Sequence, residues 1–348
     1  MAKSLGFSVY LSTFEGQRQT LAPWKGTGAP VFLSLHISEE FGADYCRKAE
    51  TACHWLAASG FRIIADVSVK TVAQFGEPDL VRLAKKLGIW ALRIDYGFST
   101  DEIMDLARQF PIVLNASTTD PESARRIAAE GVLVMAMHNF YPRPETALDS
   151  EFLLESTRSL QEAGLKVLGF IPGDETLRGP IYEGLPTLEA HRHGLPSAAF
   201  ADLVLRYGMD DVFVGDPGIS EMEQQRIRRF CDEGILSIPA ELDESAQWLY
   251  DQVFTNRVDS PAWLVRFMES RTYSCFGATV EPSCCDPRPR GTITVDNIGY
   301  GRYSGEVQML RQDHPADPRV NVIGKVCPQG LPLMDLIRRG AKFALVRP

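Results

Sequence analysis

The sequence of 348 residues lacks any long hydrophobic run, and its apolar segments fall well short of a membrane-spanning helix, which needs roughly 20 residues. Its first residues have neither the apolar core nor the small-residue cleavage site of a secretory signal. Basic residues are also scarce, with 36 Lys and Arg against 45 Asp and Glu and a formal net charge of −9. A general nucleic-acid binder normally shows a basic excess. We therefore expect a cytoplasmic protein that binds neither membranes nor nucleic acid.

Several catalytic motifs are missing as well. The seven cysteines form no CxxC pair, which favours reduced thiols over a disulfide framework. The neighbours Cys284 and Cys285 could bind a metal or be redox-active, but no second pair or suitably spaced histidine accompanies them. The HExxH spacing, the phosphate-binding P-loop and the serine nucleophile elbow are all absent. We therefore expect no cofactor and no catalytic metal.

The first 240 residues alternate between two kinds of segment. Short runs rich in β-branched residues are predicted to be strands, and amphipathic stretches between them are predicted to be helices. Helix-capping side chains precede several of these stretches, as Ser99 and Asp120 do. The eight predicted strands cover residues 6–11, 31–36, 62–66, 91–95, 112–115, 132–137, 166–171 and 211–215.

Eight strands alternating with helices over about 240 residues are typical of an α/β protein built as a TIM (β/α)8 barrel. A doubly wound open sheet is the structural alternative. That fold usually carries a glycine-rich phosphate loop after its first strand, and residues 12–16 do not form one. The pattern therefore predicts a closed barrel.

The alternation stops near residue 240. We interpret residues 241–268 as a helical linker, with helices expected at 245–254 and 260–268. Short runs separated by Gly, Pro and Asp then predict a small all-β domain over residues 269–348. The predicted organisation is thus a barrel domain (1–240), a linker (241–268) and a β domain (269–348).

Polar residues gather where the predicted barrel strands end. Because side chains alternate between the two faces of a strand, residues two apart point to the same side. This parity places a polar residue on the inward face at the end of each of the first five strands: Tyr10, His36, Asp66, Arg93 with Asp95, and Asn115. Barrel enzymes carry their chemistry at this end of the strands. An active site at the rim is therefore expected.

The loops after the sixth and seventh strands add further polar groups. The first contains His138, Asn139, Tyr141 and Arg143 and is stiffened by two prolines, which suits a substrate-positioning loop or an ordinary rigid connection. The second, residues 172–189, is too long for a simple connector and is expected to be a lid or binding loop. Anion-binding and acidic candidates in and just after it are Arg178, Glu183, Glu189 and Arg192.

Several longer motifs resemble one family, the 6-phospho-N-acetylmuramidases of the MupG type. The resemblance spans the whole chain and is carried by GFSVYLS at 6–12, SLH at 34–36, ADVS at 65–68, RIDYGF at 93–98, NAST at 115–118, HNFYPRP at 138–144, PTLE at 186–189 and YGRYSGE at 300–306. It implies a TIM barrel joined to a small cyclophilin-like β domain. It also implies a cytoplasmic glycosidase of cell-wall recycling that splits the β-1,4 bond of 6-phospho-N-acetylmuramyl-N-acetylglucosamine.

Glycoside hydrolysis usually uses two carboxyl groups beside the scissile oxygen. Asp95 shares a strand face with Arg93, so we expect it to be ionised and to act as nucleophile, base or acetamido-orienting group. Loop closure could raise the pKa of Glu189, or less favourably of Glu183, for the role of general acid. Asp66 is the reserve candidate. A 2-acetamido sugar could also supply its own nucleophile, and the sequence leaves these routes open.

A phosphorylated sugar acid needs cationic partners, for which Arg143, Arg178 and Arg192 are candidates in the barrel. Arg302 could reach the substrate from the small domain, whose alternative roles are packing and homodimerisation. Two other functions stay open. One is a sugar-phosphate isomerase or aldolase, although no lysine for Schiff-base chemistry ends a predicted strand. The other is a non-catalytic sugar-phosphate-binding protein.

Overall fold

The computed structural model describes residues 4–35, 44–250, 252–274 and 279–348. It divides into two compact units, residues 1–224 and 225–348. Each unit has its own sheet, and the two sheets share no strand.

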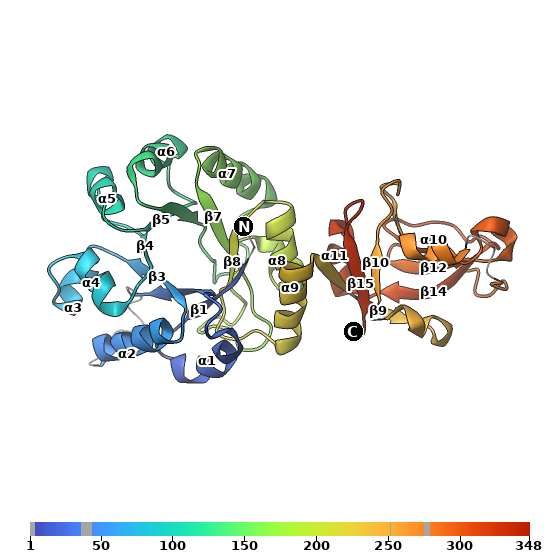
Figure 1. Ribbon diagram of the computed structural model, residues 1–348, viewed down its shortest axis with the longest axis horizontal. Helices are drawn as coiled ribbons and strands as arrows, with labels where there is room; N and C mark the ends of the chain where they lie inside the picture. The colour runs from blue at the N-terminus through green and yellow to red at the C-terminus, as the bar shows by residue number, and fades with distance from the viewer. Residues whose placement is uncertain (1–3, 36–43, 251, 275–278) are drawn as a thin grey trace. The chain divides into compact units, whose positions relative to one another are not determined.

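The first unit is a closed barrel of eight parallel strands in sequential order, with its helices outside the ring of strands (Figure 1). Every predicted barrel strand is confirmed, with ends that shift by a few residues. The strands are β1 (Ser4–Val9), β2 (Pro30–Ser34), β3 (Arg62–Val67), β4 (Ala91–Ile94), β5 (Ile112–Asn115), β6 (Val134–Met137), β7 (Lys166–Ile171) and β8 (Asp211–Val214).

At least one helix follows each strand. The helices are α1 (Phe14–Leu21), α2 (Tyr45–Ala58), α3 (Thr71–Phe75), α4 (Leu80–Leu87), α5 (Thr100–Ala107), α6 (Pro121–Glu130), α7 (Ser150–Glu162), α8 (Pro196–Leu205) and α9 (Glu221–Glu233). The sequence pattern did not predict α3, which has only five residues and is too short for a helical period to show. Within the described ranges, no helix has both the length and the apolar character needed to cross a bilayer.

The expected helix caps are present where the structure describes them. Ser99 and Glu102 form a capping box at the start of α5, and the Asp120 carboxylate accepts the Ser123 amide at the start of α6. Each such cap contributes about 1 kcal/mol and fixes where the preceding loop ends. Gly88 ends α4 in the left-handed region at φ 69°, where a side chain would also meet Ala57.

An apolar plug fills the barrel interior. Its aromatic members pack edge to face, with the Phe32 and Phe170 rings 5.3 Å apart. The buried cluster consists of Phe32, Ile64, Ala91, Val113, Met135, Met137, Leu168, Phe170 and Phe213. Burial of about 1.5–3 kcal/mol per large side chain makes this plug a main source of barrel stability. Inward positions beyond it, toward the strands' C-terminal ends, are left for polar groups.

The second unit, which is coloured orange to red in Figure 1, is built on a mixed sheet. This sheet has seven strands in the order β10-β15-β9-β14-β12-β13-β11. Phe254, Phe267 and Phe343 pack against one another in its core. Its strands are β9 (Ile235–Leu242), β10 (Val253–Thr255), β11 (Leu264–Arg266), β12 (Thr292–Asp296), β13 (Val307–Leu310), β14 (Val320–Val326) and β15 (Lys342–Val346). Two short helices accompany them, α10 (Met268–Ser274) and α11 (Leu331–Leu336).

The predicted helical linker at 241–268 is wrong. Apart from the 3-10 helix η4 (Glu244–Leu249), this stretch supplies β10 and β11, both edge strands of the second sheet. The division between units therefore lies near residue 225 instead of 240. Strands of three residues are too short to show an alternating pattern, and only pairing with β15 and β13 makes them strands.

Candidate active site

Polar side chains occupy the inward positions just above the apolar plug. Phe32, Ile64 and Ala91 belong to the plug, and the residues two positions later on the same strand face are Ser34, Asp66 and Arg93. All three polar residues are buried. The structure therefore agrees with the inward facing predicted for Asp66 on β3 and Arg93 on β4.

Arg93 is the centre of a charged network at this level. Its Nη1 lies 2.7 Å from the Asp66 carboxylate and 3.7 Å from that of Asp95, and its Nη2 donates to the Asn139 side-chain oxygen. Asp66 and Arg93 also face each other in the β3–β4 register. The Asp66 side chain is 8% exposed and that of Asp95 is 24% exposed. Asp95 is therefore the carboxylate of the network that is more accessible from the rim.

Two buried donors in this region have no hydrogen-bond partner within the described part of the chain, namely Arg93 Nε and Ser8 Oγ. Ser8 lies on β1 two residues after Gly6, which faces the barrel interior against Phe213. Buried polar groups are usually satisfied, because an unmet one costs about 1–3 kcal/mol. Unmet donors at the barrel end are typical of a site that is completed by a ligand or water.

The end of β1 and the long loop after β7 meet through Tyr10 and Arg178. The Arg178 guanidinium lies 4.4 Å from the centroid of the Tyr10 ring, and the Tyr10 hydroxyl donates to the Gly215 carbonyl. A cation over an aromatic face is attracted by the ring quadrupole. The structure thus brings two of the expected substrate-binding residues together.

Asp216 organises the long loop. Its carboxylate accepts the backbone N–H groups of Gly173, Arg178 and Leu185 at 2.9–3.0 Å. Burial raises the pKa of this carboxyl, while the three backbone donors act in the opposite direction. Since all three donors belong to one loop, we interpret Asp216 as the residue that holds this loop closed on itself.

Arg192 connects the loop after β6 to the loop after β7 through hydrogen bonds, and we call it a clamp for this reason. The expectation that Arg192 binds the substrate anion is therefore wrong. Its Nη1 donates to the carbonyls of Glu183 and Gly184, and its Nη2 donates to that of Tyr141. Its Nε and Nη2 also bind the Glu189 carboxylate, at 2.6 and 2.8 Å. A buried guanidinium whose donors are all engaged by the protein has none left for a ligand.

The expected rise in the pKa of Glu189 is not observed. The Arg192 guanidinium, together with the Glu145 and Ala147 amides, lowers the pKa of this carboxyl to about 2. A general acid must hold a proton near neutral pH. Glu189 therefore does not suit that role, and its carboxylate instead ties the loop after β6 to η3 (Glu189–His191).

Glu183 and Arg143 lie on the two clamped loops. The Glu183 carboxylate is 3.3 Å from Nε2 of His193, and both side chains are partly exposed. Arg143 is exposed on the loop after β6, where its carbonyl accepts from Thr146. Both side chains therefore remain accessible to solvent.

His138 is buried outside the barrel lumen, which corrects its expected role in substrate binding. Its Nε2 lies 2.9 Å from the Thr157 hydroxyl on α7, and its Nδ1 lies 3.5 Å from the Ser117 hydroxyl, which is in turn 3.4 Å from the Tyr141 hydroxyl. His138 follows the inward Met137 directly, so strand alternation turns its ring toward the helix layer. Tyr141 and Asn115 are half-buried, and the Asn115 side-chain oxygen accepts the Ser117 amide.

The surroundings of His138 predict an acid-sensitive barrel. Burial lowers the pKa of the imidazole from 6.5 to about 4. Between pH 6.5 and pH 4, His138 is protonated in the unfolded chain but stays neutral in the folded chain. The contribution of His138 to the free energy of unfolding is therefore fully present above pH 6.5 and is lost as the pH falls toward 4. We expect a loss of up to about 3 kcal/mol, and a smaller one in His138→Gln, which does not titrate. Urea unfolding of both proteins at pH 7 and pH 4.5 measures it, and equal losses would contradict the assignment.

Two expected site residues are not placed in this centre. His36 lies outside the described residues. Arg302 belongs to the second unit, where its guanidinium lies 5.1 Å from the Tyr303 ring centroid and donates to the Tyr303 hydroxyl at 3.0 Å. This contact lowers the pKa of the Tyr303 phenol. A role for Arg302 in substrate binding stays a prediction.

Sequence reasoning missed two exposed aromatic residues, which lie on the segments after β4 and β7. Tyr96 directly follows Asp95 and is 56% exposed, and Tyr182 lies on the loop after β7 and is 64% exposed. An exposed tyrosine ring offers a flat apolar face on which a sugar ring can pack. The sequence did offer a signal for each residue, because Tyr96 directly follows the catalytic candidate Asp95 and Tyr182 lies within the long loop after β7.

The described part of the chain contains no group of three or more His, Cys, Asp and Glu side chains arranged to hold a metal ion. The cysteines of that part are free thiols, and the adjacent Cys284 and Cys285 lie at the surface of the second unit. The Cys285 thiol contacts the Pro318 carbonyl at 3.4 Å.

Comparison with known families identifies two matches in succession. Residues 5–229 match the model described as 6-phospho-N-acetylmuramidase, N-terminal. Residues 236–346 match the one described as 6-phospho-N-acetylmuramidase, C-terminal. The two matches correspond to the two units of the structure.

Similar solved structures cover nearly the whole chain. A conserved protein of unknown function from Enterococcus faecalis is 32% identical, with a TM-score of 0.86 over 99% of this chain and 96% of its own. An uncharacterized Bacillus cereus protein is 21% identical and has the same fold, with a TM-score of 0.81 over 99% of this chain and 100% of its own. A curated UPF0288 protein from Methanothermobacter thermautotrophicus is 36% identical over 73 residues, which are 21% of this chain and 13% of that protein.

Proposed function

This chain belongs to the 6-phospho-N-acetylmuramidase family, and from that membership we propose that it is a glycoside hydrolase. Its proposed substrate is 6-phospho-N-acetylmuramyl-N-acetylglucosamine or a closely related phosphorylated amino-sugar disaccharide. The products are the phosphorylated muramic acid and N-acetylglucosamine. As part of the same proposal, the reaction belongs to cell-wall recycling in the cytoplasm, and the second unit is cyclophilin-like.

The observation that carries the proposal is the Asp66–Arg93–Asp95 network above the barrel plug. A nucleophile or base at the anomeric carbon must be a carboxylate with negative charge, and Asp95 lies beside a buried guanidinium that favours such a charge. Asp95 takes that role, or it orients a 2-acetamido group that attacks in its place. Arg93 is a positioning residue, because it acts through Asp66, Asp95 and Asn139.

The reaction also needs a proton on the glycosidic oxygen as its bond to the anomeric carbon breaks, and a water molecule then completes hydrolysis. With Glu189 held ionised by Arg192, Glu183 is the loop carboxyl that we propose for the proton donor. Its backbone carbonyl accepts from Arg192, which also binds the Tyr141 carbonyl and so joins this loop to the loop after β6. For the substrate's anionic groups, Arg178 and Arg143 remain candidates in the barrel.

The proposed function is tested by incubating the full chain with the phosphorylated disaccharide and following products by mass spectrometry. We expect release of N-acetylglucosamine together with the 6-phosphorylated sugar acid. The Asp95→Asn variant serves as the inactive control. A product of unchanged mass would indicate an isomerase, carbon–carbon cleavage would indicate an aldolase, and binding without turnover would indicate a sugar-phosphate-binding protein. Any of these three results would overturn the proposal.

A further inference from the structure

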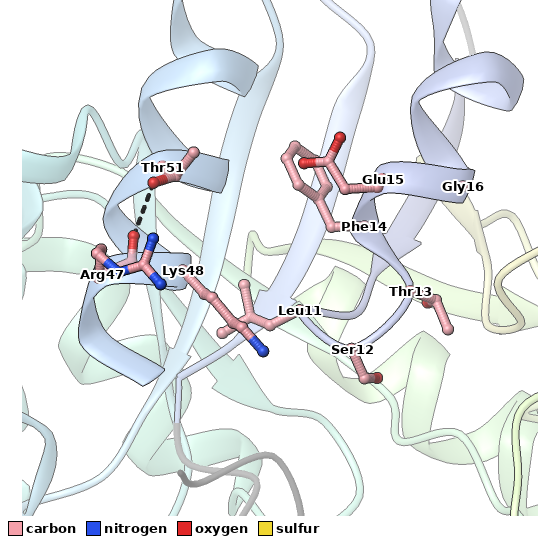
Figure 2. Close-up of a pocket in the computed structure, with 9 residues that line it drawn as sticks. All are labelled: Leu11, Ser12, Thr13, Phe14, Glu15, Gly16, Arg47, Lys48 and Thr51. Atoms are coloured by element: carbon pink, nitrogen blue, oxygen red, sulfur yellow. Dashed lines mark hydrogen bonds between the residues drawn. The ribbon is translucent and has the colours of Figure 1, made fainter. Parts of the chain in front are cut away.

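A cavity of about 330 Å³ opens beside the end of β1 (Figure 2), and its lining residues do not include the carboxylate network of Asp66, Arg93 and Asp95. Residues 11–16, which form the loop after β1 and the first turn of α1, supply one wall. Arg47, Lys48 and Thr51 of α2 supply the other. Ser12 lies two residues beyond Tyr10, so this wall begins within about 7 Å along the chain of a residue at the barrel end. A volume of this size accommodates a substituted sugar or its phosphate.

The charges around the cavity leave a positive centre. Glu15 is paired with Arg18 at 3.0 Å, and Arg47 is paired with Asp44 at 3.0 Å. Lys48 has no side-chain hydrogen bond or ion pair within the described ranges, although its charge also acts on the Asp44 carboxylate. Figure 2 shows this exposed side chain extending from α2 toward Leu11 and Ser12. On a chain with a net charge of −9, an ammonium directed into a cavity favours an anionic ligand.

Gly16 is a second sign that this wall faces a ligand. Its backbone is not in the left-handed region, and a Cβ added there would meet no atom within 4 Å. Neither conformation nor packing therefore requires glycine, which costs about 1 kcal/mol relative to alanine inside a helix. A missing side chain in the first turn lets a ligand approach the backbone N–H groups, which have no partner within the helix.

We propose that this cavity binds the phosphate group of a sugar phosphate, with Lys48 as its charged partner and the Gly16 side of α1 as its backbone wall. The inference rests on the proposed function, since it assigns the phosphorylated end of the same substrate to this cavity. The candidates expected from sequence lie on the loops after β6 and β7, and Arg192 is already engaged there. The ammonium of Lys48 takes the role that Arg192 cannot fill.

Binding measured without turnover tests the assignment. The full chain is titrated by calorimetry with N-acetylglucosamine 6-phosphate, with N-acetylglucosamine and with N-acetylmuramic acid, which carries a carboxylate but no phosphate. We expect the sugar phosphate to bind at least about tenfold tighter than either other sugar. Lys48→Ala should weaken its binding by about 10- to 100-fold, as loss of a charge-assisted hydrogen bond implies. Gly16→Val should do the same by filling the cavity, with an unchanged melting temperature.

Lys85→Ala is the matched control, because it removes one exposed positive charge from α4 of the same unit. It should bind like the wild type. Equal binding of the three sugars, or retained phosphate preference in both Lys48→Ala and Gly16→Val, would overturn the assignment. Equal binding of N-acetylmuramic acid and the sugar phosphate would also overturn it, in favour of a carboxylate site. A Lys48-dependent phosphate preference in a chain that releases no N-acetylglucosamine would support the cavity while refuting the proposed reaction.

Discussion

Replacing Asp95 with asparagine is expected to lower kcat for the phosphorylated disaccharide by about 10²–10⁴-fold, the range for loss of a positioned acid–base group. Asparagine has nearly the same shape but supplies neither negative charge nor a basic oxygen at the anomeric carbon. The Asp95 side chain is partly exposed at the rim and 3.7 Å from Arg93, so its removal should cost less than about 1 kcal/mol of stability. Steady-state kinetics and thermal unfolding of the same preparation separate the two effects.

The matched control is Asp101→Asn, an exposed carboxylate in the first turn of α5. It lies outside the network and should leave kcat unchanged. Asp95 would lose its assigned role if its variant kept kcat within about threefold of wild type, because such a change is far below the effect of a catalytic group. If kcat fell and the melting temperature fell with it, circular dichroism at the assay temperature would show whether the loss is one of folding.

Replacing Arg93 with methionine is expected to have the largest effect on stability. The buried Asp66 carboxylate would lose the guanidinium that lies 2.7 Å from it, and breaking a buried ion pair from one side typically costs about 3–5 kcal/mol. Amide hydrogen exchange in β3 and β4 reports this loss within the barrel itself. Activity should fall as well, because Asn139 and Asp95 both depend on this guanidinium for their positions.

The double variant Asp66→Val with Arg93→Met distinguishes stability from function. With both members of the pair replaced by apolar side chains, the cost of breaking the pair from one side is avoided, and the barrel should recover most of the lost stability. The activity should not recover, since Asp95 would still lack its cationic neighbour. Full recovery of activity in the double variant would show that the network serves the fold alone. Equal instability of the single and double variants would contradict the ion-pair account.

The barrel could be predicted almost completely from local pattern, and the second unit only in part. Eight apolar runs with helices between them are long enough to show their periods, and Gly or capping residues mark their ends. The strands β10 and β11 have three residues each and carry no such signal. Their identity depends on distant partners, β15 and β13, and the linker prediction failed for that reason.

Within the candidate site, strand parity was enough to bring Asp66, Arg93 and Asp95 to one face, because side-chain alternation is a local property of a strand. Only the tertiary structure shows which charged residues of the loops are already paired and which remain available for a substrate. Arg192 binds Glu189 and donates to carbonyls as far as 51 residues away, and Glu189 also accepts from backbone amides. His138 is turned toward Thr157 on a helix. Hydrogen bonds of this kind depend on the conformation of the loops over the barrel. The hydrophobic periodicity of the sequence predicts strands and helices, but it does not predict how these loops fold.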